Sequence, residues 1–119
     1  MEENDVIFDI DFALEMLDGD KELLFVLLES FLSDTSFSVQ TLQQFIREGK
    51  KSEAAAYVHA VKGAGRQLGA KRLSEVAQKL EDVLRGKDTG NIFDLSQKMN
   101  EEYKIALEET KKILSDKKV

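Results

Sequence analysis

The apolar residues of this chain recur every three or four positions, not every second position. That spacing places them on one face of an α-helix, whereas strict alternation would indicate a strand. Glycines fall mostly between the periodic segments, and the chain has no proline. The pattern predicts an all-α fold, with helical segments at about residues 9–17, 20–47, 52–68, 71–85 and 91–115.

Polar residues mark some of the predicted helix ends. Asp20 follows the stop at Gly19 and can cap the second segment, and Ser52 is a candidate cap for the third. The second segment contains weak helix formers from Ser33 to Ser36, where a long helix can bend.

Long amphipathic segments joined by short loops predict an antiparallel up-down four-helix bundle, with the short first segment as an additional N-terminal helix across one end. The 119 residues suit a single domain over residues 1–119, with its core at about 9–114. Every apolar stripe can be buried within one such bundle, so we expect a monomer. Met1 and the lysine-rich end, with Lys117 and Lys118 expected to fray, favour a free-standing protein.

Composition excludes several classes of function. The chain has no cysteine and one histidine, which leaves no thiolate zinc site and no His-rich metal site. A net charge of −6 argues against general nucleic-acid binding. The longest apolar run, Leu23–Leu28, is far shorter than the ~20 residues that cross a bilayer. We therefore expect a cytoplasmic protein without metal, cofactor, membrane or nucleic-acid partners.

The single histidine lies on the third segment, beside its buried seam. His59 is about 100° around the helix from the seam residue Val58. Glycine inside a helix costs about 1 kcal/mol relative to alanine, and packing does not require it at Gly63. Ala55 and Gly63, one turn to either side, would leave the imidazole open to a partner protein. A boundary histidine held by a hydrogen bond, beside an incidental glycine, is the alternative interpretation.

Basic residues gather around this histidine in an acidic chain. No acidic residue occurs between His59 and Glu75, whereas four basic residues do. Lys62 and Arg66, three and seven positions after His59, lie on its side of the helix. Lys62 could neutralise a phosphoryl group on the imidazole. An ordinary solvated basic turn would give the same pattern.

The turn at Gly69 and Ala70 suggests a second neighbour for the histidine. If the third and fourth segments form an antiparallel hairpin about this turn, the residue level with His59 is near position 81. Glu81 could then accept the Nδ1–H of His59, which would leave Nε2 as the free nucleophile. Glu81 also fits an ordinary glutamate on a helix surface.

Nucleotide-binding loops are absent from the sequence. Gly63 and Gly65 begin a glycine pattern, but Leu68 stands at its third position and no strand precedes it. Gly49-Lys50 lacks the Ser or Thr of a Walker motif. We therefore expect no ATP site and no independent kinase activity.

The run His59-Ala-Val-Lys62-Gly63-Ala, with Leu68-Gly69-Ala70 and Leu80-Glu81 after it, resembles the histidine-containing phosphotransfer (HPt) domain. The resemblance extends from about Asp9 to Leu114. It implies that His59 accepts a phosphoryl group on Nε2, that Lys62 contacts the phosphate, that Gly63 gives access and that Glu81 orients the imidazole. Arg66 stands where that family often has a small or hydroxyl residue, which leaves its supporting role open.

The resemblance also implies a function. The chain would relay a phosphoryl group between aspartates of response-regulator receiver domains, with a sensor (hybrid) histidine kinase as a further partner and with magnesium held by the receiver. Exposed apolar residues such as Phe12 and Met16 would help docking. The alternative is a non-phosphorylated bundle that only docks receiver domains. A purely structural bundle would leave the basic, small-residue face unexplained.

Overall fold

The computed structural model describes residues 7–116, which form six α-helices and contain no strand. This confirms the predicted all-α fold; Lys117 and Lys118 lie outside the described range. In chain order the helices are α1 (Ile10–Met16), α2 (Lys21–Ser33), α3 (Val39–Arg47), α4 (Lys51–Gln67), α5 (Lys71–Leu84) and α6 (Ile92–Asp116).

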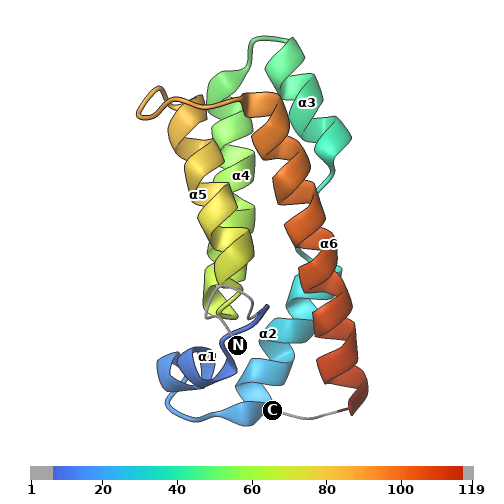
Figure 1. The fold of residues 1–119 in the computed structure, drawn as a ribbon. Helices are drawn as coiled ribbons and strands as arrows, with labels where there is room; N and C mark the ends of the chain where they lie inside the picture. The colour runs from blue at the N-terminus through green and yellow to red at the C-terminus, as the bar shows by residue number, and fades with distance from the viewer. Residues whose placement is uncertain (1–6, 117–119) are drawn as a thin grey trace.

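The helices form the predicted bundle, with α2 and α3 together making one of its four arms (Figure 1). The chain rises through α2 and α3, descends through α4, rises through α5 and descends through α6. The short helix α1 lies across the end of the bundle where α2 begins. The hairpin of α4 and α5 makes the most extensive helix–helix contact.

The predicted second helix is divided in two, which corrects the expectation of one long helix over residues 20–47. Residues 34–38 leave helical geometry, and the Ser38 side chain caps α3. Two tyrosines satisfy backbone groups freed by the break: Ser38 N donates to the Tyr57 hydroxyl at 2.8 Å, and the Tyr103 hydroxyl donates to the Thr35 carbonyl at 2.8 Å. Ser, Thr and Asp side chains compete with helical hydrogen bonds, and tertiary contacts here complete the break.

The α4 seam packs into the core as its spacing predicts. Its members are all buried: Ala54, Val58, Val61, Gly65 and Leu68. The predicted cap at Ser52 is wrong, because α4 begins at Lys51 and has no side-chain cap. Gly49, whose φ is +75°, lies in the short turn between α3 and α4, and α4 begins two residues later at Lys51.

The longest helix, α6, is amphipathic along its whole length. One face of it is buried, including Met99, Tyr103 and Ala106, and the opposite face is charged. None of the helices within residues 7–116 is both long and apolar enough to cross a membrane.

Gly69 joins α4 to α5 and contacts the N-terminal segment. Its φ is +69°, its carbonyl accepts the Asp9 N–H at 2.8 Å, and a Cβ here would lie 2.5 Å from the Asp9 carbonyl oxygen. We expect Gly69→Ala to lower the free energy of unfolding by about 2–4 kcal/mol in urea titrations, through backbone strain and this clash.

Gly86→Ala is the matched control for this substitution. Gly86 has a φ of +77°, but a Cβ at this position would meet no atom within 4 Å. Strain alone should cost about 1–2 kcal/mol there. Equal losses in the two variants would contradict a stabilising contact between Gly69 and Asp9.

Candidate functional site

His59 stands midway along α4 with one edge of its ring against α5 and the other towards solvent. Its side chain is 60% exposed. The Nδ1 atom lies 3.1 and 3.2 Å from the two carboxylate oxygens of Glu81. No hydrogen bond or ion pair between described residues involves Nε2. The structure thus brings Glu81 to His59, as the predicted hairpin register requires.

Glu81 is buried and binds three donors. Besides the imidazole, Lys62 Nζ donates to Oε1 at 2.7 Å and Arg85 Nε donates to Oε2 at 2.9 Å. Burial alone raises the pKa of Glu81, but hydrogen bonds from Lys62, Arg85 and His59 outweigh it and hold the pKa at about 2. The carboxylate is therefore ionised at neutral pH. A nitrogen facing it must carry a proton, so neutral His59 has its lone pair on Nε2.

This network makes the fold sensitive to acid in a defined range. Because the pKa of Glu81 drops from its ordinary 4.5 to about 2 on folding, the ionised carboxylate stabilises the fold above pH 4.5, and this contribution is lost as the pH falls towards 2. The shift corresponds to about 3 kcal/mol. We expect the drop in unfolding free energy over this range, measured with urea, to be about 3 kcal/mol smaller in Glu81→Gln than in the wild type.

Glu108→Gln is the control for the acid titration, because the Glu108 carboxylate is exposed and only 3.7 Å from Lys111 Nζ. Its free energy of unfolding should depend on pH as that of the wild type does. If the free energy of unfolding of Glu81→Gln fell as much between pH 4.5 and pH 2 as that of the wild type, the ionised Glu81 network would be contradicted.

Lys62 lies deeper than the sequence suggests. Its side chain is only 8% exposed, and its ammonium donates to Gln78 Oε1 at 3.1 Å as well as to Glu81. Arg66 Nη2 is 3.4 Å from the same Gln78 oxygen. Gln78 and Arg85 were missed by sequence reasoning, although both stand one turn from Glu81 on α5, where helical neighbours are expected.

Small residues surround the exposed side of His59, but they are not all those predicted. Ala55 is fully buried, so its predicted role in giving access is wrong. The exposed neighbours are Ala56, Ala60 and Gly63, at positions −3, +1 and +4. A Cβ on Gly63 would meet no atom within 4 Å. The imidazole therefore stands beside a low surface that another protein can approach.

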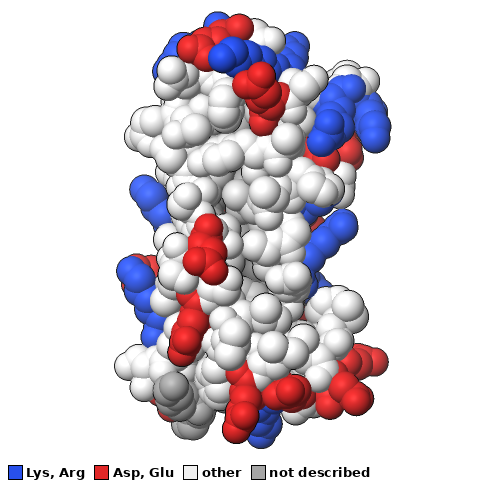
Figure 2. Space-filling model, turned by 180° about the vertical axis from the view of Figure 1, so that it is seen from behind, with Lys and Arg blue, Asp and Glu red and all other residues white. Residues whose placement is uncertain are grey.

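Apolar side chains extend this surface towards α1. Phe12 and Met16 line a hollow of about 340 Å³ whose other wall includes Arg66 and Gln67 of α4. The hollow lies about 12 Å along the helix from His59. On the face opposite that of Figure 1, uncharged residues cover much of the middle and charged ones gather towards the ends and edges (Figure 2). The exposed large apolar residues of α1 and α2 are Phe12, Met16, Leu23 and Val26.

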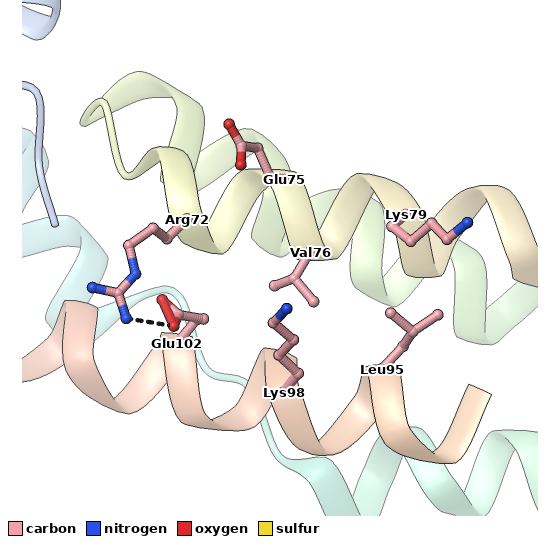
Figure 3. A pocket seen from close by; sticks show the side chains of 7 residues that line it. All are labelled: Arg72, Glu75, Val76, Lys79, Leu95, Lys98 and Glu102. Atoms are coloured by element: carbon pink, nitrogen blue, oxygen red, sulfur yellow. Dashed lines mark hydrogen bonds and ion pairs between the residues drawn. The ribbon is translucent and has the colours of Figure 1, made fainter. Parts of the chain in front are cut away.

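A second hollow lies between α5 and α6 (Figure 3). It has a volume of about 480 Å³, and an ion pair of 2.7 Å between Arg72 and Glu102 lies along it. None of the residues that line it belongs to the Glu81 network. Within residues 7–116, no three His, Asp or Glu side chains are grouped so as to hold a metal ion.

Comparison with known proteins gives the family of this chain. The Hpt domain family matches residues 26–112, about three quarters of the chain. The phosphorelay intermediate protein rdeA of Dictyostelium discoideum is 27% identical over 109 residues, which cover 92% of this chain and 41% of that protein. The chain thus spans about two fifths of the length of the curated relative that it matches. No solved structure matches it significantly. The chain belongs to the Hpt domain family of phosphocarriers, which serve histidine phosphotransfer in two-component signalling.

Proposed function

We propose that this protein relays a phosphoryl group between aspartates of response-regulator receiver domains through Nε2 of His59. The observation that carries the proposal is the exposed imidazole whose Nδ1 is bound by the buried carboxylate of Glu81. This contact directs the lone pair of the neutral ring to Nε2, beside the open surface at Gly63. The name of the matched relative, a phosphorelay intermediate, supports the same role.

The transfer needs no proton movement in either direction. The Nε2 lone pair attacks the phosphorus of a receiver phosphoaspartate, the P–O bond breaks, and its electron pair stays on the aspartate carboxylate. The phosphorylated ring keeps its Nδ1–H and becomes a cation, which the Glu81 carboxylate balances. In the reverse step a carboxylate oxygen of a receiver aspartate attacks the phosphorus and forms the P–O bond, while the N–P bond breaks and a neutral imidazole leaves. Positioning and charge neutralisation supply most of the catalysis in such transfers.

The proposal includes the partners and setting of the relay. The protein takes its phosphoryl group from a phosphorylated receiver or a sensor (hybrid) kinase, not from ATP, and magnesium is held by the receiver. Receiver domains dock over the Gly63 surface and the apolar residues Phe12 and Met16 of α1, which are exposed. A cytoplasmic location and a monomeric state complete the proposal.

Incubation with phosphorylated receiver domains tests this function. The protein is mixed with a panel of ³²P-labelled receivers in magnesium buffer, and label on the protein is tested in acid and in base. We expect label that acid removes and base does not, as for an N–P bond, and mass spectrometry should map it to His59. Stable binding of a receiver without label would overturn the relay and identify a docking module instead.

A further inference from the structure

Gln78 of α5 is a neutral side chain that binds two cations at one end and a carboxylate at the other. Its Oε1 atom accepts a hydrogen bond from Lys62 Nζ at 3.1 Å and a longer one from Arg66 Nη2 at 3.4 Å. Its Nε2 atom donates to Asp82 Oδ1 at 2.9 Å. If the amide were turned over, its NH₂ group would face the cations and its oxygen would face the carboxylate. The charges around Gln78 therefore fix the orientation of its amide.

This amide oxygen is one of two acceptors that hold the ammonium of Lys62. The other is Glu81 Oε1, which also lies 3.2 Å from His59 Nδ1. The Lys62 side chain is only 8% exposed, so these acceptors determine where the ammonium lies. An ammonium has three N–H donors, and the contacts between described residues use two of them. Lys62 is thus held beside the carboxylate that binds the histidine, with one donor left.

The acceptor at position 78 is neutral, whereas ion pairs elsewhere on α5 have carboxylate acceptors. One example is the contact of 2.7 Å between Arg72 and Glu102. A carboxylate in place of the Gln78 amide would also bind Lys62 and Arg66, but it would cancel one of their two charges. The amide oxygen binds both cations and leaves the positive charge of the site unchanged.

We propose that Gln78 is a positioning residue for phosphoryl transfer, whose neutral amide oxygen holds the ammonium of Lys62 in place without cancelling its charge. The charges of Lys62 and Arg66 then act on a phosphoryl group at His59, which carries about −2. The inference rests on the proposed function and agrees with the phosphate contact that the HPt resemblance implies for Lys62. It adds a residue that acts through Lys62 and touches no reacting atom.

Gln78→Met tests the positioning of the ammonium in the full-length protein, because methionine keeps the length of the side chain and removes its polar atoms. With the small donor phosphoramidate, we expect the maximum rate of loading to fall about tenfold and the KM for the donor to stay unchanged, since a displaced group loses much of its effect. ¹H–¹⁵N NMR before phosphorylation should show the Lys62 ammonium protons exchanging with water about tenfold faster, because one hydrogen bond is lost. The Nδ1–H form of His59 should be retained, because Glu81 still binds the ring.

The double variant Gln78→Glu/Asp82→Asn tests the neutrality of the acceptor. It keeps the net charge of the chain and a hydrogen bond between the two side chains, but it moves the carboxylate next to the cations. ³¹P NMR then follows the second ionisation of the phosphoryl group on His59 against pH. The ratio of dianion to monoanion at a given pH should fall about threefold, through Coulomb repulsion at an effective dielectric constant of about 20.

Gln44→Glu/Glu48→Gln is the matched control for the double variant. Gln44 Nε2 also donates to a carboxylate four residues later, at 3.4 Å, in an exposed pair on α3. No hydrogen bond or ion pair printed by the structure between residues 7 and 116 joins this pair to the Glu81 network. This control should load from phosphoramidate and titrate as the wild type does.

Loading of Gln78→Met at the wild-type rate would overturn the inference and leave the relay intact. A wild-type phosphoryl titration in Gln78→Glu/Asp82→Asn, or an equal fall in the α3 control, would overturn it as well. A wild-type protein that takes no phosphoryl group at His59 would contradict both the inference and the proposed function.

Discussion

Replacing His59 with glutamine is expected to remove phosphoryl uptake completely. Glutamine has a similar reach and can still meet Glu81, but its amide nitrogen is not a nucleophile and cannot form a stable N–P bond. The His59 side chain is 60% exposed and outside the core, so the free energy of unfolding should change by no more than about 1 kcal/mol. Labelling by a ³²P-phosphorylated receiver and urea unfolding of the same sample measure the two effects.

Receiver binding provides the control for this variant. Titration calorimetry with an unphosphorylated receiver should give a Kd within a few fold of the wild type, because the surrounding surface is intact. Label on His59→Gln that is still removed by acid would contradict the assignment, since the chain has no other histidine.

Gly63→Gln is expected to hinder the approach of a receiver to His59 without changing the reactivity of the imidazole. A Cβ at this position would meet no atom within 4 Å, so the variant should be as stable as the wild type or more stable by about 0.5–1 kcal/mol. The new side chain stands one turn from His59, on the surface that a receiver must approach. Displacements of about 1 Å can cost on the order of 100-fold in rate, and we expect at least that loss in single-turnover transfer from a phosphorylated receiver.

Two comparisons sharpen this prediction. Phosphoramidate is small enough to pass the glutamine, so it should label Gly63→Gln at nearly the wild-type rate. Gly63→Ala adds one methyl group and should slow receiver transfer by less than tenfold. Wild-type transfer from the receiver to Gly63→Gln would mean that the partner approaches His59 from another side.

The helices could be predicted from the chain because each apolar stripe is a local feature. The break at residues 34–38 is not local. It depends on hydroxyl groups of Tyr57 and Tyr103, which other helices bring to the backbone there. Weak helix formers marked the place, and these tertiary contacts complete the interruption.

The site was also only partly predictable from the sequence. The short turn at Gly69 sets the register of the α4–α5 hairpin, and this made the approach of Glu81 to His59 predictable. The spacing of apolar residues within α4 does not show which side of His59 a neighbouring helix covers. Ala55 was therefore expected on the open side of His59, whereas it is fully buried. The contact of Lys62 with Glu81 was not expected either, and its contact with a phosphoryl group stays a prediction.

The shared carboxylate also determines how the charge of the site changes during the relay. With neutral His59, the two cations Lys62 and Arg85 around one carboxylate leave a single net positive charge. A phosphorylated ring adds one positive charge and a phosphoryl group of about −2, which brings the cluster close to zero. In the proposed relay, this net positive charge attracts an acidic receiver pocket before transfer, and the attraction is largely lost after it. The proposed relay thus couples loading of the carrier to a weaker electrostatic attraction to the receiver that loaded it.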